Sequence, residues 1–265
     1  MNTKQLTMEE YKQVELGILI KIDKICREHN INYFLYAGTL LGAVRHQGFI
    51  PWDDDIDISM LREDYDKLAK IIQNGDYGIN FIRIEENPDT IYPYGKICDT
   101  TTTIEEKNFK EVAGYGVFVD VFPFDYLPED EQERARLKKK YFNMYRLLTH
   151  SARTGYVKTD SAVTNFERGV AFHLAKLVNT NRLITKMNSD FVNLNKKKSD
   201  HVGLPWYWAQ RLEDYQSTSE VIFEGHSFLA PKDPDRVLTT DFGEYMKLPP
   251  ESERVPKHTL ICYQK

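Results

Sequence analysis

Four aspartates stand within five positions in the segment IPWDDDIDISM, residues 50–60, and apolar residues follow them at once. Neighbouring carboxylates repel one another, and a carboxylate that is partly buried also loses hydration. A divalent cation would offset both costs, because carboxylate oxygens are suitable ligands for Mg²⁺ and Mn²⁺. The segment therefore predicts a metal site beside a strand of the core.

The alternation of an extended strand decides which of these aspartates share a face, since residues two apart point the same way. We expect a strand over residues 55–60, which projects Asp55 and Asp57 to one side. Asp53 joins them if it continues the extended run, whereas Asp54 points the other way with the apolar side chains. Two or three carboxylates on one face make an oxygen-rich site for a cation.

A candidate phosphate-binding element precedes the aspartates. The stretch YFLYAG, residues 33–38, predicts a short buried strand, and GTLLGAVRHQG, residues 38–48, predicts a helix that begins at Gly38 and Thr39. The start of a helix offers free backbone N–H groups and the positive end of its dipole, which suit a phosphate. Glycine lets the phosphate approach the backbone closely. One element would thus bind phosphates while the aspartates hold the metal that bridges them.

A third carboxylate is expected on a neighbouring strand. The stretch YGVFVDVFPF, residues 115–124, is mostly apolar and carries Asp120 inside it. A lone aspartate in an apolar strand is costly unless it has a partner, and a metal would be that partner. An alternative is that Asp120 only satisfies backbone groups near the edge of a sheet.

Two structural readings of the aspartate cluster stay open beside the metal site. Asp53, Asp55 and Asp57 mimic positions 1, 3 and 5 of a calcium-binding loop, but position 6 is Ile58, where such a loop requires glycine. The cluster can also be a solvated turn after Pro51. The Gly-Thr turn upstream argues against both readings, since neither of them needs it.

The remaining patterns predict an α/β (α+β) fold, a mixed-sheet core with a helical insertion. Thr7 and Glu10 form a capping box for a helix that ends near Asn30. Further helices are expected over 62–73, 129–150 and 162–179 and from Asp233, with strands over 79–84, 92–99, 101–106 and 115–124 and a hairpin over 219–231. We assign residues 1–128 and 216–265 to the core and 129–215 to a mainly helical insertion.

The composition argues against several classes of protein. The chain has 265 residues and a net charge of −5, which does not suggest a general nucleic-acid binder. Its basic runs, 138–140 and 196–198, are expected to be solvated. Cys26, Cys98 and Cys262 are far apart, so their spacing predicts neither a zinc site nor a disulfide framework.

The expected location follows from what the chain lacks. Its first residues have no apolar core of a signal peptide, and no apolar run approaches the ~18 residues of a transmembrane helix. The sparse cysteines fit a reducing compartment. We expect a cytoplasmic protein without a transmembrane segment, one that can meet a lipid-linked substrate at the inner face of the membrane.

Three segments together resemble one known family. YAGTLLGAVRHQGFIPWDDDIDISM, residues 36–60, resembles the signature of the LicD family, which includes the fukutin-related enzymes and belongs to the nucleotidyltransferase superfamily. The segments at 115–128 and 228–249 are similar to later LicD segments. The resemblance implies a nucleotidyltransferase-like core and an enzyme that transfers a phosphorylated alcohol, usually phosphocholine from CDP-choline, to a glycan hydroxyl. The implied acceptor is a teichoic acid or lipopolysaccharide precursor, the product is CMP, and the cofactor is Mg²⁺ or Mn²⁺.

The resemblance also implies roles for individual residues. Metal ligands are implied at Asp55, Asp57 and Asp120, with Asp53 as a further ligand, and these first three are the candidate catalytic residues. We hypothesise that Asp120 also helps to remove the proton from the acceptor hydroxyl. The implied phosphate contacts are Gly38, Thr39, Arg45 and Lys96.

Two of these phosphate contacts have plainer alternatives. Arg45 and its neighbour His46 can simply complement the dipole at the end of a helix. Lys96 can be an exposed lysine on a strand.

The transferred group and the activity itself both have alternative interpretations. Trp206, Tyr207 and Trp208 can form a cation–π pocket for choline, or they can belong to the core. The same site can use another CDP-alcohol that carries ethanolamine, ribitol or glycerol. A non-catalytic module that binds nucleotide or glycan is a different class, and an enzyme that adds nucleotides and releases pyrophosphate is a further one.

Overall fold

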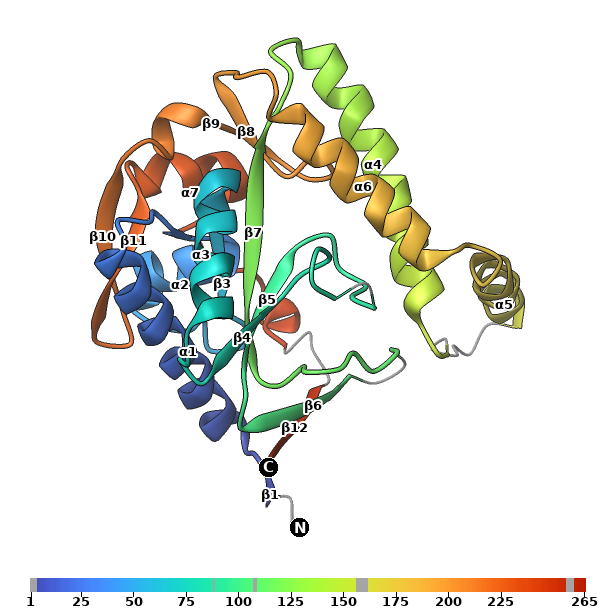
Figure 1. Ribbon diagram of the computed structural model, residues 1–265, viewed down its shortest axis with the longest axis horizontal. Helices are drawn as coiled ribbons and strands as arrows, with labels where there is room; N and C mark the ends of the chain where they lie inside the picture. The colour runs from blue at the N-terminus through green and yellow to red at the C-terminus, as the bar shows by residue number, and fades with distance from the viewer. Residues whose placement is uncertain (1–3, 88, 107–108, 156–161, 256–259) are drawn as a thin grey trace.

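The computed structural model describes residues 4–87, 89–106, 109–155, 162–255 and 260–265, and its centre is a mixed seven-stranded sheet (Figure 1). The strands follow the order β2 (Phe34–Leu35), β3 (Asp57–Leu61), β7 (Phe118–Tyr126), β5 (Gly95–Asp99) and β4 (Ile79–Ile82), and β8 (His201–Gly203) joins β7 to β9 (Ala209–Arg211). β3 and β7 run parallel, and the other pairs are antiparallel. The predicted α+β class is confirmed.

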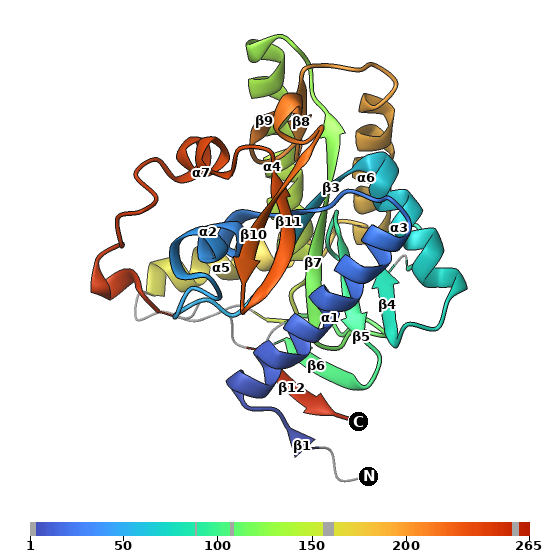
Figure 2. The same cartoon turned by 90° about the vertical axis from the view of Figure 1, so that its left-hand side faces the viewer.

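Helices cover both faces of this sheet. Figure 1 shows α1 (Met8–Glu28), α2 (Ala37–His46), α3 (Arg62–Asn74) and α7 (Pro234–Phe242) to the left of β7, and α4 (Glu131–Ala152) and α6 (Thr180–Leu194) to its right. In Figure 2, α1 crosses in front of β7. The predicted capping box starts α1: Thr7 accepts a hydrogen bond from the N–H of Glu10, and Glu10 accepts one from the N–H of Thr7. The apolar face of α1 is buried, so a local signal and burial agree on this helix.

Two smaller β units complete the core. The predicted hairpin is confirmed as β10 (Thr218–Phe223) and β11 (His226–Pro231), and its turn uses positive φ at Glu224 and Gly225. A three-stranded sheet places β12 (Leu260–Gln264) between β1 (Lys4–Gln5) and β6 (Thr102–Glu106). This sheet joins the two ends of the chain (Figure 1).

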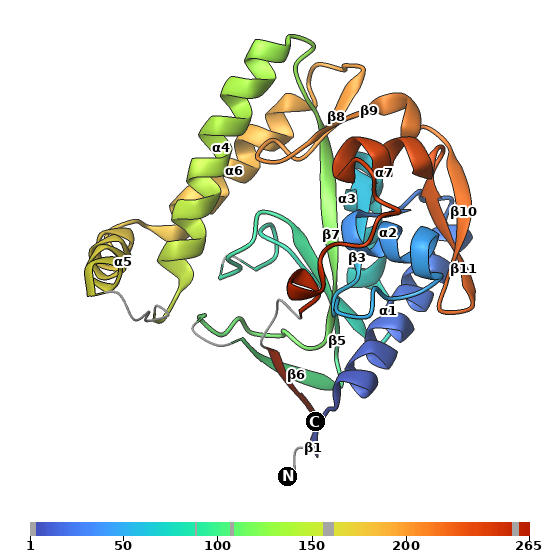
Figure 3. The ribbon, with the colours of Figure 1, turned by 180° about the vertical axis from the view of Figure 1, so that it is seen from behind.

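Three helices form what we call the helical arm, residues 131–194, made of α4 (Glu131–Ala152), α5 (Ala162–Ala175) and α6 (Thr180–Leu194). The expected single helix over 162–179 is wrong at its end, because Asn179 caps the start of α6 by accepting a hydrogen bond from the N–H of Arg182. Figures 1 and 3 show α5 at the far end of the arm, away from the β10–β11 hairpin. None of the described helices is both long and apolar enough to cross a membrane.

A buried ion pair joins α3 to the sheet, and Asn195, directly after the helical arm, bonds to the same pair. The guanidinium of Arg62, at the start of α3, donates two hydrogen bonds, of 2.8 and 2.7 Å, to the carboxylate of Asp125 near the end of β7. Asn195, which caps α6, donates to the same carboxylate and also accepts from the N–H of Tyr126. α3, β7 and α6 therefore meet at one polar centre.

Removal of Asp125 would leave the buried Arg62 charge without its carboxylate. We expect Asp125→Ala to lower the free energy of unfolding by about 3–5 kcal/mol, the cost typical of breaking a buried pair. The measurement is urea unfolding followed by circular dichroism. As a matched control, Asp89→Asn removes the exposed ion pair with Lys110 and should cost less than about 1 kcal/mol. Equal costs for the two variants would contradict this account.

Candidate active site

The centre of the site is a row of charged side chains across three strands. Asp57 on β3 stands in register with Asp120 on β7, and Asp120 stands in register with Lys96 on β5. The ammonium of Lys96 donates to a carboxylate oxygen of Asp120 at 2.6 Å. Residues in register on neighbouring strands project to the same face, so the three side chains share one surface of the sheet.

Lys96 is buried, which makes the alternative of an exposed strand lysine wrong. Its ammonium lies 3.5 Å from the ring centroid of Phe118 and 4.5 Å from that of Tyr92. The rings and the carboxylate of Asp120 together compensate for the loss of water around the charge. The structure therefore places Lys96 as the partner of Asp120, and a phosphate contact by Lys96 stays a prediction.

The backbone of Asp57 is held from the side of α2. Its N–H donates to the hydroxyl of Thr39 at 2.7 Å, and its carbonyl accepts from the N–H of Tyr36 at 3.0 Å. The hydroxyl of Thr39 thus positions the aspartate strand, a role that the sequence pattern did not reveal. Whether Thr39 also contacts phosphate stays a prediction.

The strand begins at Asp57 rather than near Asp55. The expected alternation in burial nevertheless includes the residues just before the strand. Burial alternates from Asp53 to Ile58, with Asp53, Asp55 and Asp57 the more exposed members. The three line a cleft of about 510 Å³ together with Gly38 and Arg45.

Asp54 is buried and lines a small hollow on another side, beside Tyr11 and Cys262. One carboxylate oxygen from each of Asp53, Asp54 and Asp55 can lie within 4.8 Å of the others. Asp54 therefore faces away from the cleft, as the alternation predicts, but its carboxylate lies close enough to those of Asp53 and Asp55 to make it a further candidate ligand.

The first turn of α2 is unusual in its backbone. The helix begins at Ala37, one residue earlier than expected, and Ala37 has a φ of 45° in the left-handed region. Tyr36 precedes the helix and its side chain does not cap it. At Gly38, a Cβ atom would lie 2.6 Å from a carboxylate oxygen of Asp53. A side chain at position 38 would therefore displace the carboxylate of Asp53, and strained backbone such as that of Ala37 is typical of functional sites.

The carboxylates impose a cost on the folded protein. Burial raises the pKa of Asp57 well above its usual range, and the nearby charges of Asp55 and Asp120 raise it further, whereas Lys96 lowers it. A divalent cation bound by these oxygens would remove the repulsion. The donor set is all oxygen, which fits Mg²⁺ or Mn²⁺.

A further carboxylate, missed in the sequence, lies behind the cluster. Glu15 is fully buried on the inner face of α1, and neither of its oxygens has a hydrogen-bond partner among the residues that the structure describes. Burial raises its pKa well above the usual range, and the charge of Asp55 adds to this effect. The available signal was a glutamate on the apolar face of a helix, three positions before the buried Ile18.

Arg45 ties α2 to the segment that follows α7. Its guanidinium donates to the carbonyl of Tyr245 at 2.7 Å and to a ring nitrogen of His46 at 2.9 Å. Burial and the neighbouring Arg254 lower the pKa of Arg45. The position of Arg45 on the cleft wall leaves its predicted contact with phosphate open.

Aromatic side chains also line the cleft, and together we call them the aromatic wall. They are Trp52, Tyr207, Phe242 and Tyr245, and three of them come from the chain beyond residue 200. Figure 3 shows α2, α7 and the segment after α7 on this side of the molecule. The cleft thus combines acidic groups with aromatic rings.

The aromatic cluster expected at 206–208 is divided between three environments. Trp206 is buried and its ring stacks on those of Tyr145 and Phe191, so it belongs to the core. Trp208 is exposed, and the ammonium of Lys138 lies 3.9 Å from the centroid of its ring. Of this cluster, only Tyr207 lines the cleft that holds the aspartates.

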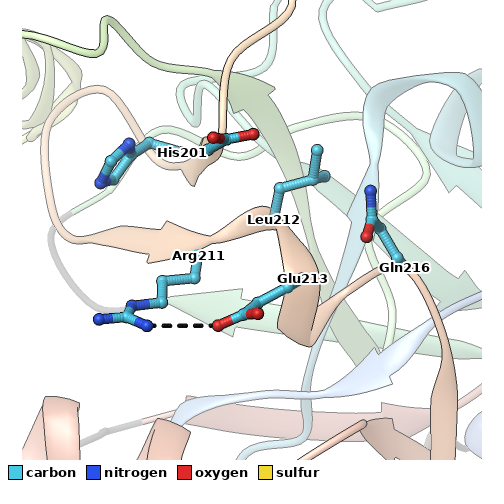
Figure 4. A pocket seen from close by; sticks show the side chains of 6 residues that line it. His201, Arg211, Leu212, Glu213 and Gln216 are labelled. Atoms are coloured by element: carbon cyan, nitrogen blue, oxygen red, sulfur yellow. Dashed lines mark hydrogen bonds and ion pairs between the residues drawn. The ribbon is translucent and has the colours of Figure 1, made fainter.

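A second hollow of about 440 Å³ lies beside β8 and β9 (Figure 4). Its lining includes His201, Arg211, Glu213 and Gln216. Arg211 and Glu213 form an ion pair with each other at 3.3 Å, and Asp200 adds a carboxylate to the same wall. None of the predicted site residues lines it, and we do not assign it to the reaction.

Comparisons with known proteins agree with the sequence motifs and confirm the resemblance. Residues 30–154, which include the charged row, match the family described as LicD/FKTN/FKRP, nucleotidyltransferase domain. The chain is 28% identical over 275 residues to a protein of Haemophilus influenzae named lipopolysaccharide cholinephosphotransferase LicD, a match that covers 98% of this chain and 99% of that protein. Shorter matches join it to uncharacterized proteins of Rickettsia typhi, 47% identical over 70 residues, and Rickettsia prowazekii, 51% identical over 49 residues. These cover 26% and 18% of this chain and 23% and 18% of the relatives.

The repulsion around Asp57 predicts an unusual effect of its removal. In metal-free buffer with a chelator, Asp57→Asn should raise the free energy of unfolding by about 1–2 kcal/mol, because it removes a buried like charge. Added Mg²⁺ should raise the melting temperature of the wild type but much less that of the variant. Thermal unfolding with and without Mg²⁺ measures both effects.

The matched control is Asp76→Asn, which removes the same charge from an exposed position. It should leave the melting temperature and its response to Mg²⁺ unchanged. A less stable Asp57→Asn protein in the chelator would show that repulsion is not the dominant effect at this site.

Proposed function

Since the chain carries a LicD-family nucleotidyltransferase domain, we propose that it is a metal-dependent phosphotransferase that moves phosphocholine from CDP-choline to a sugar hydroxyl of a glycan precursor. The proposed acceptor is of the lipopolysaccharide type, since the Haemophilus influenzae relative is named for that substrate. The proposed product beside the modified glycan is CMP.

One observation carries this proposal. Three aspartates, the strained helix start at Ala37 and a set of aromatic rings line the same cleft of about 510 Å³. A cleft of this size accepts a small molecule, and it offers both oxygens for a metal and rings for a cation. CDP-choline carries the two matching parts, a diphosphate that binds a metal and a quaternary ammonium.

The reaction balances without an oxidant or a second cofactor. The acceptor oxygen forms a bond to the phosphorus that carries choline, and the bond from this phosphorus to the bridging oxygen breaks. CMP leaves with the bridging oxygen and both electrons of that bond, and the hydroxyl proton passes to a base. A bound Mg²⁺ or Mn²⁺ would neutralise charge on the diphosphate and on the leaving group.

In our proposal, the aspartates of the cleft and the residues of the charged row have different roles in this reaction. Asp53, Asp55 and Asp57 line the cleft and would hold the metal, with Asp120 as a further ligand. We also propose Asp120 as the base that receives the hydroxyl proton. Lys96 offsets the negative charge of Asp120 through its ion pair and so limits repulsion within the row.

The helix start and Arg45 would hold the phosphates. The first N–H groups of α2 lie beside Gly38, at which a side chain would meet Asp53, so a phosphate and a metal can be bound next to each other there. Arg45 lies on the same wall and carries a positive charge. Both features serve any CDP-alcohol, and they do not select choline.

Release of CMP tests the function. With CDP-choline, Mg²⁺ and a deacylated lipopolysaccharide acceptor, we expect release that depends on both metal and acceptor. Asp55→Ala should lower the rate by at least about 100-fold, because it removes a carboxylate of the metal site. Glu213→Gln, in the second hollow, should keep the wild-type rate.

Other outcomes separate the alternatives. Turnover of CDP-ribitol, CDP-glycerol or CDP-ethanolamine, but not CDP-choline, would keep the chemistry and reject choline. Release of pyrophosphate from CTP would indicate nucleotide addition. Tight binding of CDP-choline with no turnover in the presence of metal and acceptor would indicate a binding module.

The aromatic wall predicts how choline is selected. Tyr207→Ala should raise the KM for CDP-choline about 3- to 30-fold with a smaller effect on kcat, because a desolvated cation–π contact contributes about 0.5–2 kcal/mol. Trp208→Ala is the matched control, since its ring already faces Lys138 and is not part of the cleft wall. Steady-state kinetics with CDP-choline measure KM and kcat for both variants. Equal changes in KM would show that Tyr207 has no special role in binding choline.

A further inference from the structure

The outer face of α5 is apolar, and no other described part of the chain covers it. The exposed fractions are 74% for Phe166, 42% for Val170, 60% for Leu174 and 82% for Leu177, which follows the helix. Their spacing of four, four and three positions places them along one side of a helix. Ala175 lies on the opposite side and is buried, so the helix packs inward through its other face. A row of large exposed apolar side chains is typical of an interaction surface.

The helical arm is positively charged, in contrast to the rest of the chain. Residues 131–194 contain 12 basic and 5 acidic residues, a net charge of +7, while the remainder contains 23 basic and 35 acidic residues, a net charge of −12. Two of the five acidic residues, Glu131 and Glu133, lie in the first turn of α4 next to the sheet. Beyond the first ten residues of α4, residues 141–194 contain 7 basic and 3 acidic residues, a net charge of +4. The exposed basic residues there include Arg146, Arg168, Arg182 and Lys186.

We propose that the helical arm docks on an anionic membrane surface, with α5 lying in the plane of the interface and its apolar side toward the acyl chains. Burial of a helix face and attraction of basic side chains by anionic lipids are the two terms that drive such binding. The occupant must be both apolar and negatively charged, and an anionic bilayer supplies both properties. A second copy of this chain would bring an equally positive arm to the contact, and the two arms would repel each other.

Figures 1 and 3 show α5 at the far end of the helical arm, on the other side of β7 from α2 and α7, the helices that line the cleft with the aspartates. A bilayer that contacts α5 is therefore reached by the end of the arm and not by the wall of the cleft. Membrane binding itself does not depend on the proposed reaction.

Vesicle sedimentation tests the docking surface with the full-length protein. We expect binding to vesicles of phosphatidylcholine with phosphatidylglycerol, little binding to phosphatidylcholine alone, and weaker binding as salt rises. Leu174→Ser combined with Leu177→Ser should lower binding to the anionic vesicles by at least about tenfold, because two exposed apolar side chains are lost from the face. Thermal unfolding should show that this variant stays folded, since both side chains are exposed.

The control variant combines Met8→Ser with Ile222→Ser, two exposed apolar residues outside the arm, and should bind as the wild type does. Three results would overturn the proposal: no binding of the wild type to anionic vesicles, equal binding to neutral vesicles, or equal loss in the control variant. Light scattering after size-exclusion chromatography tests the remaining alternative, that a second copy of this chain occupies the face. A dimer that the α5 variant converts to a monomer would assign this face to a second copy instead.

Discussion

The parallel pairing of β3 with β7 is the constraint on which the site depends, because it fixes Asp57 beside Asp120. A shift of one residue in this pairing would turn the acidic side chains of a strand toward the opposite face. The register is held from that opposite face, where Ile58 and Val121 are fully buried in the core. The apolar residues between the charged ones therefore determine where the charges lie. Lys96 enters the same row through the antiparallel pairing of β5 with β7.

The same arrangement places function and stability in opposition. The strand holds Asp57 among like charges, and Glu15 adds a buried carboxylate behind them. The compensating contacts come from elements distant in sequence. Lys96 of β5 donates a hydrogen bond to Asp120, and the hydroxyl of Thr39 in α2 accepts one from the N–H of Asp57. A protein selected for stability alone would place apolar groups at these positions. The retention of so many carboxylates in one place agrees with a site whose charge is balanced by a bound cation.

Local patterns allowed correct predictions where a feature depends on neighbours in sequence. The capping box at Thr7 defines the start of α1, and strand alternation separated Asp53 from Asp54 although the strand itself begins later. Features that depend on tertiary contacts could not be predicted. The burial of Lys96 requires the neighbouring strand and its rings, and the core position of Trp206 requires packing against α4 and α6. The aromatic wall joins residues from three distant segments, and no periodicity in the sequence marks them as a set.

The small sheet that holds β12 between β1 and β6 has a consequence for how the protein is made. β1 and β12 pair through Lys4 and Gln264, so the contact spans nearly the whole chain. Synthesis proceeds from the N-terminus, and β1 and β6 must therefore wait for β12 with their hydrogen-bonding edges open. Unpaired edges are the usual starting points of association between chains, and contacts of such long range form slowly. The small sheet therefore closes only after β12 has been synthesised, and until then the edges of β1 and β6 are open to association with other chains.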